Sequence, residues 1–325
     1  MSSILNSVLS LSAMGLVFGA GLAYASQKFA VEVDPKEEAI LNALPGANCG
    51  GCGFPGCGGL ATAIAKGEAA TNACPVGGAE VAEKISEIMG VNASAGTKMI
   101  ANVICNGTNS NAKNKSLYSG ILDCKAASLV ANGPKSCSYG CLGFGTCENV
   151  CPFDAIHVYD DGIAHVDEEK CVGCGKCIEA CPKAVIHWIP YGQEVSIDCN
   201  SKEKGKDVKE KCSVGCIGCQ ICVKSCPFQA ITFENNLAKI DYSKCTQCMV
   251  CVEKCPTKAI SGDLSKRKTA RVIEDLCIGC TICAKNCPTN AIEGELKSLH
   301  KVDPDKCIGC KVCYQKCPKK AIEMI

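Results

Sequence analysis

The first hydrophobic segment of the chain is long and carries no charge. No ionisable side chain occurs between residues 2 and 27, and the 22 residues from Ile4 to Ala25 are apolar or small. A helix of that length spans a bilayer. We therefore predict a single-pass transmembrane anchor over residues 1–28.

Two alternatives to the anchor stay open. A cleaved signal peptide is one, because Ala23, Tyr24 and Ala25 resemble a small-x-small cleavage site. No Lys or Arg precedes the apolar segment, which disfavours that alternative. A buried helix of a soluble domain is the other.

Downstream of the apolar segment the pattern changes twice. Residues 35–78 are rich in Gly and Cys, which predicts a compact unit. Residues 79–89, AEVAEKISEIM, place apolar side chains at helical spacing, and Gly90 follows. This pattern predicts a helix that ends at Gly90.

From about residue 104 a short apolar motif recurs. An Ala-Ile pair follows a Cys-Pro dipeptide, then a polar turn and a second apolar stretch such as Leu237–Ile240. Apolar alternation around a turn predicts small β-hairpins. The pairs are Ala155-Ile156, Ala230-Ile231, Ala259-Ile260, Ala291-Ile292 and Ala321-Ile322, with Ala184-Val185-Ile186 as the variant.

Cysteine supplies 32 of the 325 residues, and most follow one repeat, C-x2-C-x2-C-x3-C-P. We call each copy a cysteine run. Strict runs begin at Cys171, Cys216, Cys245, Cys277 and Cys307, and a looser run begins at Cys137. Such runs bind 4Fe-4S clusters, and the fourth cysteine of one run ligates the cluster of the other. Structural zinc sites usually pair C-x2-C knuckles instead, and a disulfide network is the remaining alternative.

Pairing successive runs predicts six clusters in three two-cluster ferredoxin modules. Each cluster takes three cysteines from one run and the fourth from its neighbour. The predicted sets are Cys137, Cys141, Cys147 and Cys181; Cys171, Cys174, Cys177 and Cys151; Cys216, Cys219, Cys222 and Cys255; Cys245, Cys248, Cys251 and Cys226; Cys277, Cys280, Cys283 and Cys317; and Cys307, Cys310, Cys313 and Cys287.

Eight cysteines lie outside these sets. The Gly-rich segment contains Cys49, Cys52, Cys57 and Cys74, which we predict to hold a seventh cluster in a separate domain. The remaining four either bind an eighth 4Fe-4S cluster or are buried free thiols, which pack as small hydrophobic groups. They are Cys105, Cys124, Cys199 and Cys212.

Other chemistry is scarce in the sequence. We find no phosphate-binding or dinucleotide-binding glycine motif and no hydrolase elbow, so no catalytic residue and no nucleotide or flavin site is expected. The four histidines are expected to be surface or hairpin residues: His157, His165, His187 and His300. The net charge of +1 gives no indication of a nucleic-acid partner.

Charge gathers near one end of the chain. Residues 297–325 contain seven Lys against three acidic residues. One hypothesis is a docking face for an acidic soluble ferredoxin, and the alternative is a solvated basic surface.

These features together predict an α+β protein in five parts. They are a transmembrane anchor (1–28), a single-cluster domain (29–90), a first ferredoxin module with flanking cysteines (91–215), a second module (216–262) and a third (263–325). Because proteins with metal-bound thiolates are mostly cytosolic, the cluster domains are expected on the cytoplasmic side of the cell (inner) membrane.

The order of these features resembles the B subunit of the Rnf complex, in its long polyferredoxin form from anaerobic bacteria. The uncharged first span, the C-x2-C-x4-C-x16-C-P unit at residues 49–75 and the ferredoxin repeats carry the resemblance. It implies a subunit of an Na⁺- or H⁺-translocating ferredoxin:NAD oxidoreductase, with no catalytic site of its own.

The resemblance also implies partners. Electrons would come from reduced soluble ferredoxin and leave for flavin-bearing subunits, and other membrane and peripheral subunits would hold the NAD site and the ion path. A polyferredoxin of a different membrane oxidoreductase, such as a hydrogenase, is one alternative. A corrinoid methyl-transfer protein is another, because it has a similar four-cysteine domain.

Overall fold

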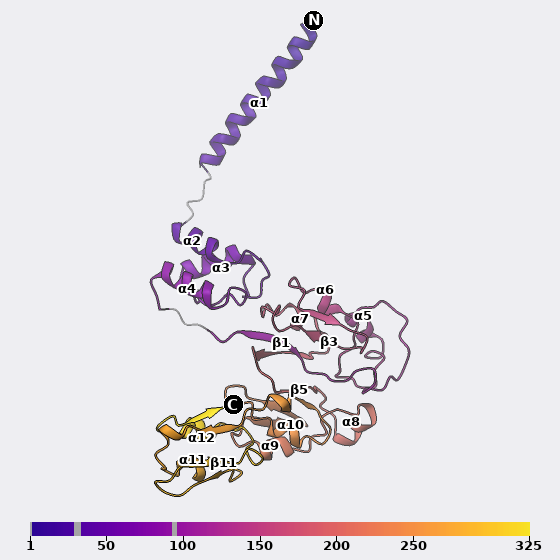
Figure 1. The fold of residues 1–325 in the computed structure, drawn as a ribbon. Helices are drawn as coiled ribbons and strands as arrows, with labels where there is room; N and C mark the ends of the chain where they lie inside the picture. The colour runs from indigo at the N-terminus through magenta and orange to yellow at the C-terminus, as the bar shows by residue number, and fades with distance from the viewer. Residues whose placement is uncertain (1, 29–33, 93–95) are drawn as a thin grey trace. The chain divides into compact units, whose positions relative to one another are not determined.

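The computed structural model describes residues 2–28, 34–92 and 96–325 (Figure 1). The chain divides into two compact units. The first comprises Met1–Asn48 with Phe54–Ser94, and the second comprises Cys49–Gly53 with Ala95–Ile325. Each is described by itself below.

The apolar segment forms one helix, α1 (Ser2–Lys28). In the part of the chain that the structure describes, its segment Val8–Ser26 is the one stretch long and apolar enough to cross a membrane, and none of it is buried. Leu11, Leu16 and Leu22 are each more than 70% exposed. The buried-helix alternative is therefore not what the structure has, whereas a signal sequence would share this length and composition.

Three further helices make the core of the first unit: α2 (Pro35–Ala43), α3 (Gly56–Ala65) and α4 (Gly78–Met89). The Asp34 side chain caps α2 by accepting a hydrogen bond from the Lys36 N–H at 2.9 Å. Ile40, Leu60, Ile64 and Ile85 are almost completely buried.

The predicted helix before Gly90 is confirmed, and Gly90 ends it in the left-handed region. Residues 35–78, predicted as a compact Gly- and Cys-rich unit, contain α2 and α3. Helix α2 packs against both α3 and α4.

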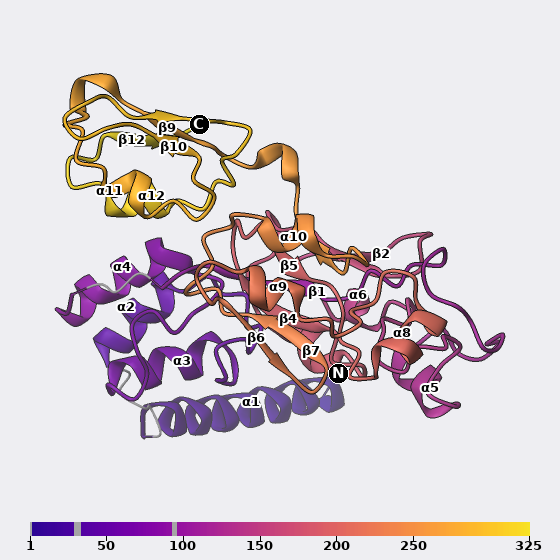
Figure 2. The same cartoon turned by 90° about the horizontal axis from the view of Figure 1, so that it is seen from below.

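The second unit contains three modules with one strand order. In each, two short helices and a central hairpin lie between a leading and a closing strand (Figure 2). Module one has β1 (Met99–Val103), α6 (Thr146–Asn149), β2 (Ile156–Val158), β3 (Ala164–Val166), α7 (Lys176–Ala180) and β4 (Ile186–Pro190). Module two has β5 (Ser196–Ile197), α9 (Ile221–Ser225), β6 (Ile231–Glu234), β7 (Leu237–Ile240), α10 (Val250–Lys254) and β8 (Ile260–Ser261). Module three has β9 (Ala270–Val272), α11 (Ile282–Lys285), β10 (Ile292–Glu293), β11 (Lys301–Val302), α12 (Val312–Lys316) and β12 (Ile322–Met324).

Four short helices lie outside this scheme. They are α5 (Cys124–Leu129), α8 (Gly205–Lys211), η1 (Leu264–Lys266) and η2 (Glu274–Leu276). The first two belong to insertions that separate a leading strand from the cysteine run that follows it.

Half of the predicted hairpins are confirmed. The pairs β2–β3, β6–β7 and β10–β11 are antiparallel hairpins, with Ile231 opposite Ile240 in the second. The prediction is wrong for the other three Ala-Ile strands. β4, β8 and β12 pair with the leading strands β1, β5 and β9.

The leading strands also shift one predicted boundary. β5 pairs with β8 of the second module, so that module begins before residue 216. The insertion that carries α8 therefore lies inside module two.

A buried carboxylate joins the first two modules. Asp198, which is 8% exposed, accepts hydrogen bonds from Ser196 Oγ at 2.7 Å, from Asn106 Nδ2 at 3.2 Å and from Ser261 Oγ. Asn106 lies in the module-one insertion, whereas Ser196 and Ser261 lie on β5 and β8. One side chain thus satisfies three donors that come from distant parts of the sequence.

Replacing Asp198 should destabilise this junction. In Asp198→Ala one buried and two partly buried donors lose their acceptor, and each unsatisfied buried group costs about 1–3 kcal/mol. We expect a clearly lower thermal midpoint in anaerobic calorimetry. Asp198→Asn keeps one acceptor oxygen and should lose less, so equal losses in the two variants would contradict the role assigned to this carboxylate.

Candidate metal centres

Four cavities in the second unit are each lined by four cysteines. Their volumes, including space open to solvent, are about 310–360 Å³. Each takes three cysteines from one run and one from the paired run, as the two-cluster rule predicts. The sets are Cys151, Cys171, Cys174 and Cys177; Cys226, Cys245, Cys248 and Cys251; Cys277, Cys280, Cys283 and Cys317; and Cys287, Cys307, Cys310 and Cys313.

A fifth set gathers around Cys222. Burial raises the pKa of the Cys222 thiol to about 11, and the neighbouring thiols of Cys216, Cys219 and Cys255 raise this pKa as well. These are the four cysteines predicted for the other cluster of module two.

The loops of the strict runs share an unusual backbone. Two residues in each, the second and the fourth after its first cysteine, have positive φ. They are Gly173 and Gly175, Gly218 and Gln220, Gln247 and Met249, Gly279 and Thr281, and Gly309 and Lys311. Alternation of right- and left-handed residues turns backbone N–H groups inward and forms an anion-binding nest. The loops are therefore shaped for an anionic group, independently of their cysteines.

In four of the six runs, the alanine three residues after the Cys-Pro dipeptide also has a role. Its N–H donates to the sulfur of the fourth cysteine: Ala155 to Cys151 at 3.4 Å, Ala230 to Cys226 at 3.3 Å, Ala291 to Cys287 at 3.2 Å, and Ala321 to Cys317 at 3.2 Å. Hydrogen bonds to cluster sulfurs tune the reduction potential. The strand that follows the run thus holds one ligand in place.

The first run differs from its predicted form. Gly143 and Gly145 have φ of 75° and 73°. They stand two and four residues after Cys141, as the left-handed residues of the strict runs stand after their first cysteine. Cys141 is therefore the first cysteine of this run and Cys147 the third, and Phe144 occupies the place of the second.

Cys124 lies where the second cysteine is missing. Its N–H donates to Thr146 Oγ1 at 2.7 Å, next to Cys147, and Thr146 Oγ1 donates to Asp123 Oδ2 at 2.7 Å. Burial raises the pKa of the Cys147 thiol to about 12, and the thiols of Cys141, Cys124 and Cys181 are among its neighbours.

The predicted grouping of Cys137 with Cys141, Cys147 and Cys181 therefore differs from the structure. Cys137 lines another cavity with Cys105, Cys199 and Cys212. The sequence signal that could have revealed this is spacing, because Cys141 and Cys147 are six residues apart, as are the first and third cysteines of every strict run.

The N-terminal cysteines stay a prediction as a cluster set. Cys57 lies in the first turn of α3, is buried, and donates its N–H to Asn48 Oδ1 at 2.8 Å. Cys74 precedes α4 in the same unit, whereas Cys49 and Cys52 belong to the second unit.

No disulfide joins the cysteines in the part of the chain that the structure describes. Among the residues that the structure describes, no group of three or more His, Cys, Asp or Glu side chains is arranged for a single metal ion.

One histidine was missed by sequence reasoning. His300 lies in the hairpin β10–β11 as expected, but it is 1% exposed and lines the cavity of Cys277, Cys280, Cys283 and Cys317. Its Nδ1 is 3.1 Å from the Ser298 carbonyl oxygen, and Nε2 has no hydrogen-bond partner in the described chain. His157, His165 and His187 contact nearby carboxylates or carbonyl oxygens.

Comparison with known families finds iron–sulfur domains along the chain. The family described as "4Fe-4S dicluster domain" matches residues 238–293 and 270–324, and a second family of that description matches 215–259. Families described as "4Fe-4S binding domain" match 164–187 and 141–155, the latter from Cys141 onward. A family described as "Putative Fe-S cluster" matches 44–76.

Curated relatives extend the match over most of the chain. The B subunit of the Na(+)-translocating ferredoxin:NAD(+) oxidoreductase complex of Acetobacterium woodii is 53% identical over 81% of this chain and 80% of its own length. The B subunit of the proton-translocating complex of Clostridium ljungdahlii is 47% identical over 75% of this chain and 87% of its own length. The B subunit of an ion-translocating oxidoreductase complex of Methanosarcina acetivorans is 44% identical over 76% of this chain and 94% of its own length. The chain belongs to the family of Rnf complex B subunits. It contains several 4Fe-4S domains, and its relatives are electron-transfer subunits of an oxidoreductase complex.

The loop of Cys307 and Cys310 offers a test of site geometry. Gly309 has φ +63°, and an added Cβ would collide with the Lys268 carbonyl oxygen. Gly309→Ala should lose the iron of one cluster, about four atoms per chain, because backbone strain and collision together displace the loop.

Gly192→Ala is the matched control. Gly192 has φ +74° and open space around the position of a Cβ, so this variant has the strain without the collision. Iron analysis after anaerobic purification measures both. Equal iron content in the two variants would contradict the close packing assigned to Gly309.

Proposed function

We propose that this chain is the electron-input subunit of a membrane-bound ferredoxin:NAD oxidoreductase that translocates Na⁺ or H⁺. It accepts electrons from reduced soluble ferredoxin and relays them through 4Fe-4S clusters towards flavin-bearing partner subunits. The observation that carries this proposal is the series of four-cysteine cavities with anion-binding loops in a member of the family of Rnf complex B subunits. Besides the clusters of the three modules, Cys49, Cys52, Cys57 and Cys74 would hold one.

Contacts between the cysteine loops support a relay. Thr246, next to Cys245, donates its Oγ1 to the Cys310 carbonyl oxygen at 3.4 Å. The set containing Cys245 and the set containing Cys310 therefore lie next to each other. Clusters are one-electron carriers, so adjacent sets allow short successive transfers. Reduction of one NAD⁺ to NADH uses two such electrons and one proton.

The membrane part of the proposal rests on α1. This helix would be a single-pass anchor in the cell membrane with the cluster domains on the cytoplasmic side, where ferredoxin and NAD are found. No ionisable residue lies between residues 2 and 27, so the ion path is assigned to other subunits.

The direct test is ferredoxin-driven NAD reduction in native membranes with and without the gene for this chain. We expect activity to disappear on deletion and to return on complementation. Unchanged activity after deletion would overturn the assignment and place the chain in another membrane oxidoreductase, such as a hydrogenase.

The lysines of module three fit a docking face for an acidic ferredoxin. Lys311, Lys319 and Lys320 form no ion pair within the described chain, whereas Lys316 donates to Asn286 Oδ1 at 2.7 Å. Lys306, by contrast, pairs with Asp303 at 3.1 Å. The unpaired charges are free to attract an anionic partner and to speed its approach.

Reversing these charges should slow electron entry. With Lys311, Lys316, Lys319 and Lys320 all replaced by Glu, we expect a rate of reduction by ferredoxin at least tenfold lower at low salt, and weaker dependence on salt. Stopped-flow spectroscopy at several ionic strengths measures both.

The matched control reverses four exposed lysines around α8: Lys202, Lys204, Lys206 and Lys209. Its net charge changes by the same amount, but its rate should stay near that of the wild type. Equal slowing in the two variants would show that net charge alone acts and would remove the docking face.

A further inference from the structure

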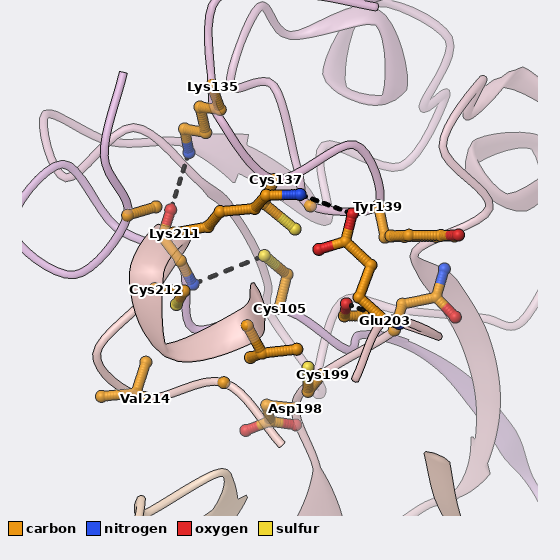
Figure 3. A pocket seen from close by; sticks show the side chains of 17 residues that line it. Cys105, Lys135, Cys137, Tyr139, Asp198, Cys199, Glu203, Lys211, Cys212 and Val214 are labelled. Atoms are coloured by element: carbon orange, nitrogen blue, oxygen red, sulfur yellow. Dashed lines mark hydrogen bonds and ion pairs between the residues drawn. The ribbon is translucent and has the colours of Figure 1, made fainter. Parts of the chain in front are cut away.

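One cavity of the second unit is lined by cysteines that no strict run contributes. It measures about 480 Å³, including space open to solvent, and is lined by Cys105, Cys137, Cys199 and Cys212 (Figure 3). The four cysteine-lined cavities of the strict runs are smaller, at about 310–360 Å³. This cavity therefore has room for a group of the same size.

Two insertions build the cavity. Cys105 and Cys137 lie between β1 and Cys141, and Cys199 and Cys212 lie between β5 and Cys216. In the third module only residues 273–276 separate β9 from Cys277. The extra cysteines thus occur in the two modules that have an insertion before the first run, and both insertions are in the same place.

The insertions are joined by backbone hydrogen bonds. Lys113 N–H donates to the Lys211 carbonyl oxygen at 2.9 Å, and Ser213 N–H to that of Asn111 at 2.9 Å. Ala112 and Cys212 form an isolated antiparallel bridge between these bonds. The two halves of the cavity are therefore held together by the fold.

The sulfur atoms face a common space. A Cβ added to Gly140 would stand 3.5 Å from Cys105 Sγ and 3.7 Å from Cys137 Sγ. Burial raises the pKa of the Cys199 thiol to about 12, although the backbone N–H groups of Cys216 and Ser201 lower this pKa. Buried thiols in one cavity are an unusual arrangement unless they bind a shared group.

Two lysines, Lys135 and Lys211, and two carboxylates, Asp198 and Glu203, line the cavity. Lys135 is only 4% exposed, and its Nζ donates to the carbonyl oxygens of Gly107 at 2.7 Å and Gly162 at 2.9 Å. It has no carboxylate partner in the described chain. Lys211 and Glu203 also line the cavity but pair with each other at 2.6 Å. A buried cation without a counter-ion is costly, and an anionic cluster would supply the missing charge.

We propose that Cys105, Cys137, Cys199 and Cys212 bind an additional 4Fe-4S cluster, and that Cys124 completes the ligand set of Cys141, Cys147 and Cys181. This inference rests on the proposed function, because it assumes clusters in the neighbouring sets. Each of the 32 cysteines then belongs to one of eight sets of four.

The position of the site gives it a role in the relay. Cys141 N–H donates to Cys105 Sγ at 3.3 Å, so the site adjoins the set of module one. Cys212 stands four residues before Cys216 in the chain, so the site also adjoins the set of module two. The additional cluster therefore carries electrons between modules that would otherwise be linked only by protein.

Double substitutions separate this ligand assignment from simple pairing of successive runs. The full-length protein is purified anaerobically, and iron, acid-labile sulfide and zinc are measured per chain. Wild type should hold about 32 iron atoms, four for each cluster. Cys137→Ala with Cys199→Ala should lose about four, because both residues serve one cluster, whereas Cys137→Ala with Cys124→Ala should lose about eight.

Each contrary result overturns the proposal. Loss of about eight iron atoms in Cys137→Ala with Cys199→Ala would place these ligands in different clusters. Wild-type iron content in Cys199→Ala would identify a free thiol, and stoichiometric zinc in the wild type would identify a zinc site. Absence of NAD reduction with the iron results as expected would remove the proposed function and leave the site in place.

Lys135→Met tests the site without removing a ligand. Loss of a buried cation should lower the reduction potential of an adjacent cluster while iron content stays constant. An anaerobic redox titration followed by electron paramagnetic resonance measures the shift. Lys206→Met, at an exposed position of α8, is the control. A titration of Lys135→Met that coincides with that of the control would overturn the placement of a cluster beside Lys135.

Discussion

Convergence of four cysteine sulfurs on one cavity is the constraint on which the second unit depends. The apolar core of module three illustrates it, since Cys283 and Cys313 pack there with Ala270, Ile292 and Ile322. Strands this short cannot form a large core by themselves. Binding of a cluster to thiolates couples directly to folding, so the cofactor and the thin hydrophobic layer stabilise the module together.

The loops and strands serve that convergence in complementary ways. Left-handed residues at two fixed positions curl each loop so that N–H groups point inward. At Gln220, Met249, Thr281 and Lys311 this conformation is adopted by residues other than Gly, which disfavour it. The strain is tolerated because the loop is fixed by its cysteines, by its short helix and by the alanine N–H that bonds the last sulfur.

The insertions of modules one and two connect these two modules to each other. In modules one and two the chain leaves the leading strand, forms a segment with α5 or α8, and only then enters the cysteine run. Asp198 and the backbone bonds near Lys113 and Lys211 join these segments. Two ferredoxin modules thereby become one continuous structure, and the cavity between their insertions lies on the path from one to the other.

The sequence by itself indicated the kind of site, and it grouped cysteines of the strict runs as the cavities of the structure group them. Five strict cysteine runs carry this information locally, because spacing within a turn dictates which sulfurs can reach one cluster. The helix before Gly90 and the three hairpins could also be predicted, because the pattern that specifies each of them lies within a short stretch of sequence.

Tertiary structure decided what depends on contacts between distant segments. The closing strands β4, β8 and β12 pair with the leading strands at the start of their modules, and no local pattern specifies a partner so far away. The predicted places of Cys124 and Cys137 are reversed in the structure, and this difference has the same cause. Both lie in an insertion without repeat spacing, so only its folding against Thr146 and the second insertion determines which cavity each thiol enters.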